Sequence, residues 1–239
     1  MSLNSKIEWT ETTWNPVTGC TKISTGCQNC YAYTLAKRLK AMSNPRYING
    51  FDVTLHYDLL DKPLSWKSPK KIFVNSMSDL FHEDISIEFI EKVFATMNKA
   101  SWHTFQVLTK RSENLKKLSP SLKWSENIWM GVTVESFLEK YRIDDLKETD
   151  AKIKFLSLEP LLSSLGDINL NGIDWVIVGG ESGPKARPMN IDWVREIRDQ
   201  CIEQKTPFFF KQWGGVNKKK NGRLLDNKIW DEYPRYAHE

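Results

Sequence analysis

The 239-residue chain lacks the features of membrane, secreted and multidomain proteins. It contains no run of about 18 apolar residues, the length that a membrane-spanning helix needs. Met1–Glu11 has no basic segment followed by an apolar stretch, so no secretory signal is expected. There is no internal repeat, no low-complexity tract and no linker rich in glycine, serine or proline. These absences predict a cytoplasmic protein with no membrane partner, folded as one domain over residues 1–239.

Cysteine is scarce and the net charge is small. In a reducing compartment, the four cysteines are expected to be metal ligands or core residues rather than members of disulfides. The formal charge of +4 permits a nucleic-acid or phosphate-bearing partner without requiring one. With 40% hydrophobic residues, a chain of this length can bury a substantial core.

Short β-branched or aromatic runs recur along the chain, and their nearly continuous apolar character is typical of parallel strands buried on both faces. A first strand is expected near Ile7–Trp14, and the others are Lys71–Asn75, Thr104–Leu108, Ile128–Val132, Lys154–Ser157, Asp174–Val178 and Pro207–Phe210. Helical patterns occupy Tyr31–Met42, Ser86–Ala100, Ser136–Glu148 and Asn190–Gln204. The alternation predicts an α/β protein, a partial (β/α)6-type TIM barrel of mostly parallel strands, with a flat doubly wound sheet as the alternative.

Polar or glycine residues follow most of these runs, at the ends where barrel enzymes place their chemistry. The candidate site residues are Ser76, Ser78, Asp79, Lys110, Glu135, Glu159, Gly179, Gly180, Glu181 and Lys211. Two glycines in a row allow close backbone approach to an adenine or ribose, and the two lysines are candidates to face the substrate. Purely structural roles for these residues remain as alternatives. Asp79 could cap the following helix, and Glu135 and Glu159 could form buried ion pairs with Lys110 or Arg111.

Three cysteines within eleven residues form the most informative motif, C-x6-C-x2-C at Cys20, Cys27 and Cys30. Thiolates select zinc or iron–sulfur clusters, and structural zinc takes four protein ligands. Cys201 lies on the apolar face of an expected helix and is interpreted as a core residue. Three thiolates without a fourth fit a [4Fe–4S] cluster with one open iron. Zinc completed by His56 or His82, and cysteines without metal, are the alternatives.

The segment Asn29-Cys30-Tyr31-Ala32 resembles the cluster loop of radical S-adenosylmethionine enzymes, although six residues instead of the usual three separate the first two cysteines. That longer spacing is similar to a phage and bacterial three-cysteine-motif family of the DUF5131 type. The resemblance to this family includes the segments at 14–20, 75–81, 108–111, 131–135, 158–161 and 179–183. Leu108-Thr109-Lys110 is also similar to spore photoproduct lyase, a radical enzyme that repairs DNA.

The resemblance implies a partial TIM barrel that binds a [4Fe–4S] cluster and S-adenosylmethionine. It implies that Ser76, Ser78 and Asp79 hold the amino group of that cofactor. Glu135 and Glu159 are candidates for its ribose or methionine end, and the Gly-Gly-Glu of Gly179–Glu181 lies on a later strand than usual.

Two functions follow from these features. The first is a radical enzyme that modifies or repairs a nucleic acid. The second is a non-catalytic nucleic-acid-binding protein with a structural zinc or iron–sulfur site. A C-terminal extension of about residues 213–239 contains Lys218–Arg223, interpreted as a basic hairpin with its turn at Asn221-Gly222. A separate partner protein is also considered.

Overall fold

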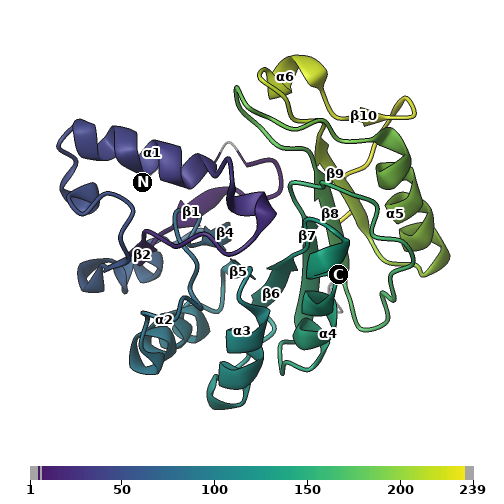
Figure 1. Cartoon of the computed structure of the whole chain (residues 1–239). Coiled ribbons are helices and arrows are strands. Elements are labelled where there is room, and N and C mark those ends of the chain that lie inside the picture. Colours follow the sequence, from purple (N-terminus) through teal and green to yellow (C-terminus); the bar gives the residue numbers. More distant parts are fainter. Residues whose placement is uncertain (1–4, 6, 235–239) are drawn as a thin grey trace.

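A seven-stranded sheet organises the computed structural model, which describes Ser5 and residues 7–234. All neighbouring strands in this sheet are parallel. Their order is β1 (Thr12–Trp14), β4 (Lys71–Val74), β5 (Thr104–Thr109), β6 (Ile128–Thr133), β7 (Ile153–Leu158), β8 (Trp175–Gly179) and β9 (Phe208–Gln212). Because this order never reverses, there is no switch point of the doubly wound kind. The sheet curves into a half-barrel (Figure 1), which confirms the predicted partial TIM barrel.

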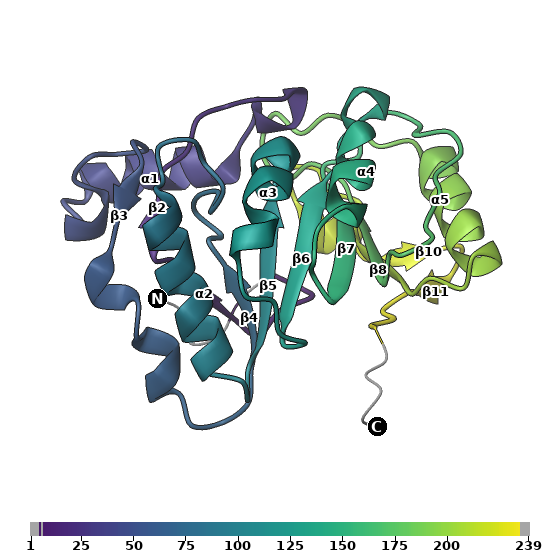
Figure 2. The same ribbon diagram turned by 90° about the horizontal axis from the view of Figure 1, so that it is seen from below.

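The helices that follow the strands cover the outer face of the half-barrel (Figures 1 and 2). They are α2 (Ile87–Lys99), α3 (Ser112–Leu118), α4 (Tyr141–Lys147) and α5 (Ile191–Glu203). A large apolar core fills the space between them and the sheet. Cys201 of α5 is fully buried there, as the sequence predicted. In the described part of the chain, no helix combines the length and apolar character needed to cross a membrane.

Aromatic rings fill the concave side of the sheet. The buried cluster consists of Trp9, Phe73, Trp129, Phe155, Trp175, Ile177 and Phe209. Side chains two residues apart on a strand point to the same face, so Ser157 and Glu159 follow Phe155 on this side, and Lys211 follows Phe209. The interior is therefore apolar deep inside and polar at the carboxyl ends of the strands, which face the viewer in Figure 1.

Most predicted helices and strands are present, and the differences lie at 136–148, in α3 and in the C-terminal hairpin. The segment at 136–148 forms a 3₁₀ turn (Phe137–Glu139) before α4, because the Ser136 side chain accepts a hydrogen bond from the backbone N–H of Leu138 and ends the regular helix pattern. The helix α3 was not predicted. Its seven residues are too few to show a clear helical period.

The predicted turn at Asn221-Gly222 was wrong. Lys218–Asn221 forms the short helix α6, and the hairpin follows it as β10 (Leu224–Leu225) and β11 (Lys228–Ile229). Its two turn residues, Asp226 and Asn227, have φ of 51° and 60°, which matches a type I′ turn. The side chain of Asn221 instead donates a hydrogen bond to the Gly214 carbonyl at 2.7 Å.

Candidate functional site

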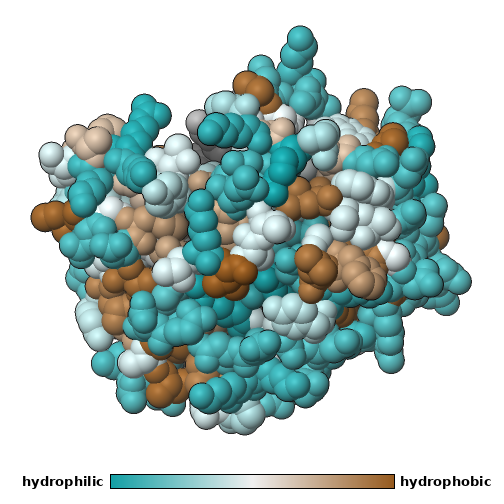
Figure 3. Space-filling view, in the orientation of Figure 1, coloured by the Kyte–Doolittle hydropathy of each residue, from teal (hydrophilic) through white to brown (hydrophobic). Residues whose placement is uncertain are grey.

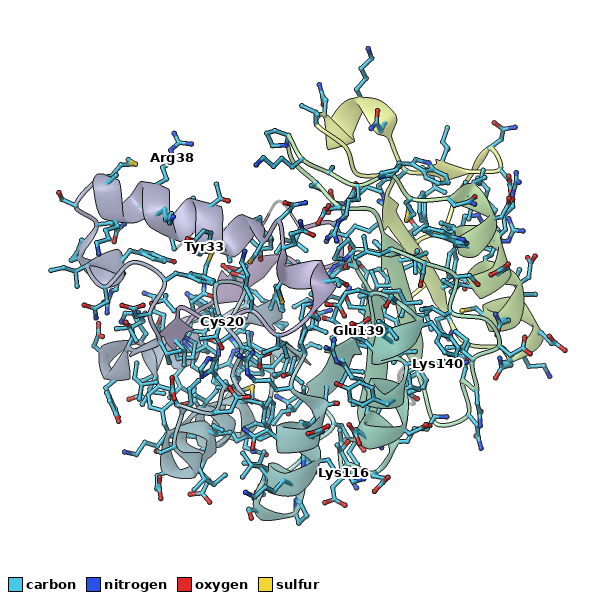
Figure 4. All side chains as sticks on the ribbon, in the orientation of Figure 1. Cys20, Tyr33, Arg38, Lys116, Glu139 and Lys140 are labelled. Atoms are coloured by element: carbon cyan, nitrogen blue, oxygen red, sulfur yellow. The ribbon has the colours of Figure 1, made fainter. Side chains whose placement is uncertain are left out.

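The three cysteines lie on one loop, residues 19–31, that follows β1 and the short strand β2 (Val17–Thr18). We call this segment the cysteine loop. Gly19 begins it with φ of 87°, and a Cβ at that position would lie 2.1 Å from the Asp52 carbonyl oxygen. Cys27 ends a 3₁₀ turn, and Cys30 directly precedes α1 (Tyr31–Ala41). All three thiols are partly exposed, and Figure 4 shows Cys20 near the carboxyl ends of the strands.

Arg111, which follows β5, holds the start of the cysteine loop. Its Nε donates to Glu83 at 2.8 and 3.0 Å, and its Nη1 donates to Asp79 at 3.3 Å and to the Cys20 sulfur at 3.4 Å. Its Nη2 donates to the hydroxyl and carbonyl oxygens of Thr21 at 2.8 and 3.2 Å. A guanidinium has five N–H donors in a fixed plane, and this environment uses all of them. Arg111 therefore joins Asp79 and Glu83 to the start of the cysteine loop and also donates a hydrogen bond to the first thiol.

Replacing Arg111 by lysine should destabilise the protein by about 1–3 kcal/mol, because buried acceptors that an ammonium cannot reach lose their partners. Urea unfolding of the metal-free protein measures this change. The matched control is Arg195→Lys, since Arg195 also binds a carboxylate, that of Asp226, but at an exposed position. We expect no measurable change there. Equal stability of the two variants would contradict the role given to Arg111.

Glu135, which follows β6, holds the middle of the cysteine loop. The carboxylate is fully buried and pairs with Lys110 at 2.5 Å and Arg142 at 2.7 Å. It also accepts a hydrogen bond from the Ser24 hydroxyl at 2.5 Å. A Cβ on Gly26 would lie 2.3 Å from Oε1 of Glu135, so only glycine lets the loop approach this closely. Burial alone would raise the pKa of Glu135, but Lys110 and Arg142 outweigh it and hold the pKa below its ordinary value.

Glu181, which follows β8, holds the end of the cysteine loop. Its Oε2 accepts from the Asn29 side chain at 3.0 Å, and the carboxylate pairs with Arg187 at 2.5 Å. Arg187 in turn donates to the Thr25 carbonyl at 3.1 Å and to the Gln28 side chain at 3.4 Å. Burial would raise the pKa of Glu181, but the hydrogen bonds from Arg187 and Asn29 lower it overall. The loop is thus fixed to the ends of three separate strands.

The residues that follow β4 contact Tyr31 at the end of the cysteine loop and Val17 just before its start. Tyr31 donates its hydroxyl to the Ser76 carbonyl at 2.5 Å, and Ser78 donates to the Val17 carbonyl at 2.8 Å. Asp79 is buried and accepts from the Thr109 hydroxyl at 2.6 Å and from the Lys110 backbone N–H at 3.0 Å.

Asp79 also accepts from the backbone N–H of Phe81 at 3.1 Å. It therefore caps a local turn, not α2, which begins eight residues later at Ile87. The proposed role of Asp79 toward an amino group would require some of these bonds to be exchanged.

Glu159 and Lys211 form a second group at the ends of β7 and β9. Their ion pair is 2.9 Å long, and Ser157 donates to Glu159 at 3.1 Å. A Cβ on Gly179 would lie 2.5 Å from Oε1 of Glu159, and one on Gly180 would lie 2.2 Å from the Trp213 carbonyl. Among the described residues, this group makes no hydrogen bond or ion pair to the cysteine loop.

The predicted ion-pair alternatives hold in part. Glu135 pairs with Lys110, as one alternative proposed, but Arg111 pairs with Asp79 and Glu83 instead. Glu159 pairs with Lys211, a combination that was not considered. Sequence reasoning missed Ser24, Arg142 and Arg187, and it did not foresee the contacts that Asn29 and Gly26 make with Glu181 and Glu135.

The three partly exposed thiols are donors of the kind that iron–sulfur clusters take. Over the described residues, no group of three His, Cys, Asp or Glu side chains is already placed to hold a metal ion. His56 and His82 instead contact the hydroxyls of Thr18 and Thr21 at 2.9 and 2.8 Å. Burial raises the pKa of the Cys20 thiol to about 12, and coordination by iron would deprotonate it.

Comparisons with known proteins show the family and the fold of the chain. The family described as "Protein of unknown function (DUF5131)" matches residues 4–234. No curated protein matches the chain. A solved structure of spore photoproduct lyase, in complex with dinucleoside spore photoproduct, is similar in fold with a TM-score of 0.51 at 10% identity. The match covers 82% of this chain and 62% of the lyase, so the chain spans less than two thirds of that protein.

Proposed function

We propose that this chain, which belongs to the DUF5131 family, is a radical S-adenosylmethionine enzyme. The observation that carries the proposal is a loop with three cysteines and no fourth, fixed by Arg111, Glu135 and Glu181 to the carboxyl ends of a half-barrel. A [4Fe–4S] cluster with S-adenosylmethionine on its open iron supplies, once reduced, a 5′-deoxyadenosyl radical that abstracts hydrogen from a substrate.

The polar residues divide into two groups in this proposal. Asp79, Glu135 and Glu181 act as positioning residues, because they and their cationic partners already bind the cysteine loop. Ser76, Ser78 and the group around Glu159 contact the cofactor. Gly179 and Gly180 let it approach the sheet, and Lys110 and Lys211 face the substrate from their ion pairs.

A nucleic acid is the proposed substrate. The support is the similarity in fold to spore photoproduct lyase, whose structure contains a dinucleoside photoproduct, together with the net positive charge. A non-catalytic nucleic-acid-binding protein is the second candidate. It is favoured by one observation, that three of the strand-end carboxylates are already engaged in holding the loop.

Binding of S-adenosylmethionine separates the two candidates. We expect binding by the anaerobically reconstituted protein and none by the Cys20→Ala/Cys27→Ala/Cys30→Ala variant, because the open iron provides the anchor. Equilibrium dialysis measures both. Glu159→Gln should weaken binding about tenfold without loss of iron, since a charge-assisted hydrogen bond contributes roughly 1.5–3 kcal/mol. The control is Glu91→Gln on the exposed face of α2. Equal binding with and without the cluster would favour the second candidate.

A further inference from the structure

Three segments of the chain carry basic residues and no acidic ones. They are residues 12–51, 182–191 and 211–225. Together they contain 12 of the 34 lysines and arginines and none of the 30 aspartates and glutamates. The remainder therefore carries 22 basic against 30 acidic side chains, a net charge of −8. The small overall charge of +4 conceals this strong segregation.

The fold brings the three segments to the same face as the cysteine loop. The first segment contains that loop and α1, and the third contains α6. The second pairs with the third, because Gly183 donates its backbone N–H to the Gly215 carbonyl at 3.1 Å and Ser182 forms a bridge with Gly215. Figure 1 shows α1 and α6 on the two sides of the open edge of the half-barrel. We call the three segments together the basic rim.

Most cations of the basic rim whose side chains the structure describes have no carboxylate partner. Arg46, Arg187 and Lys211 form ion pairs. Over the described residues, no ion pair involves the exposed cations Lys22, Lys37, Arg38, Lys40, Lys185 and Lys220. Figure 4 shows Arg38 pointing from α1 away from the body of the protein, and Figure 3 shows long hydrophilic side chains along this edge. Lys22 donates to the Gln28 carbonyl at 3.1 Å, and Lys22 and Lys37 lie over the Tyr33 ring. None of the six cations has to break an ion pair in order to bind a phosphate.

An exposed aromatic ring lies within the rim. Tyr31 is 56% exposed although its hydroxyl is held by the Ser76 carbonyl. A ring fixed at its polar end can stack on an unpaired base, and proteins that bind single strands combine such rings with cationic surfaces. The ring follows Cys30 directly in the sequence.

We infer that the basic rim binds the phosphodiester backbone of a nucleic-acid strand, which runs from α1 to the α6 side across the open edge of the half-barrel. This inference deepens the proposed function by naming the surface that holds the substrate, and it rests on that function only for the chemistry. A strand on this path passes over the cysteine loop, so one of its nucleotides lies next to the candidate radical site. Tyr31 favours a single-stranded region at that position.

The test is fluorescence anisotropy of a labelled 30-nucleotide DNA strand of mixed sequence, titrated with the cluster-loaded protein at several salt concentrations. The variant is Arg38→Glu/Lys40→Glu, which reverses two exposed cations in the last turn of α1. Two lost phosphate contacts should weaken binding about 25-fold at roughly 0.1 M salt, because each contact to a single strand contributes about 0.7 to the slope of log K against log salt. The slope itself should fall by roughly 1.4.

The matched control is Lys99→Glu/Lys117→Glu, which reverses two exposed last-turn cations on α2 and α3 and brings the net charge from +4 to zero, as the variant does. Binding within threefold of wild type for the control, with the large loss for the rim variant, supports the inference. Equal losses in both would assign binding to net charge and overturn it. Absence of binding by the wild-type protein, or tighter binding of polyglutamate than of DNA, would also overturn it. Formation of 5′-deoxyadenosine without substrate, measured on the same samples, reports separately on the proposed function.

Discussion

Replacement of Cys27 by alanine is expected to abolish iron binding. The wild-type protein should take up about four irons and four sulfides per chain on anaerobic reconstitution. Two remaining thiolates cannot hold such a cluster. Iron and sulfide analysis, together with the brown visible absorbance of such clusters, measures the loss. Cys20→Ala and Cys30→Ala should behave in the same way.

Cys201→Ala is the matched control for this loss. Its thiol is fully buried in the core under α5, far from the cysteine loop in sequence and on a different face of the sheet. We expect full iron content in that variant with a modest loss of stability. Stoichiometric zinc and no iron uptake by the wild-type protein would contradict the cluster assignment.

Glu135→Ala is expected to destabilise the protein by about 3–5 kcal/mol, because it leaves the buried guanidinium of Arg142 and the partly buried ammonium of Lys110 without a counter-charge. Lys110 and Arg142 both pair with this carboxylate, and Ser24 of the cysteine loop loses its acceptor. Urea unfolding of the metal-free protein measures the change. Iron uptake should also fall, since the middle of the loop is no longer held.

Two further variants test the cause of that loss. Glu91→Ala removes an exposed carboxylate from α2 and should leave the unfolding midpoint unchanged. A double-mutant cycle between Glu135 and Arg142 should show coupling of more than about 1 kcal/mol, because the two side chains are in direct contact. Additive effects in that cycle would show that the buried pair does not hold the site together.

The sequence predicted the sheet well because the strands are buried on both faces and their apolar runs are continuous. Val176, Ile177 and Val178 of β8, for example, are all fully buried. The cysteine motif could also be recognised in the sequence, because its three members lie close together in the chain. The contacts that position the loop could not be predicted, because they join residues far apart in the chain. Ser24 and Glu135 are 111 residues apart, and Asn29 and Glu181 are 152 apart.

The C-terminal segment shows a different limit of sequence reasoning. Asn221-Gly222 is a strong local signal for a hairpin turn, yet Asn221 ends a helical turn and binds the Gly214 carbonyl. The hairpin instead turns at Asp226-Asn227, where Asp226 pairs with Arg195 and Arg198 of α5. Tertiary contacts decide between two turn sequences that are only a few residues apart. The ion pair between Glu159 and Lys211 depends in the same way on the sheet order, because it joins residues at the ends of β7 and β9, the two neighbours of β8.

The most direct test of the central claim is anaerobic incubation of the reconstituted protein with dithionite and S-adenosylmethionine, followed by chromatography. We predict slow formation of 5′-deoxyadenosine and methionine even without substrate, and none above background for the variant that lacks Cys20, Cys27 and Cys30. Product at the level of that variant, from protein with a full and reducible cluster and with DNA and RNA supplied, would contradict the assignment as a radical enzyme.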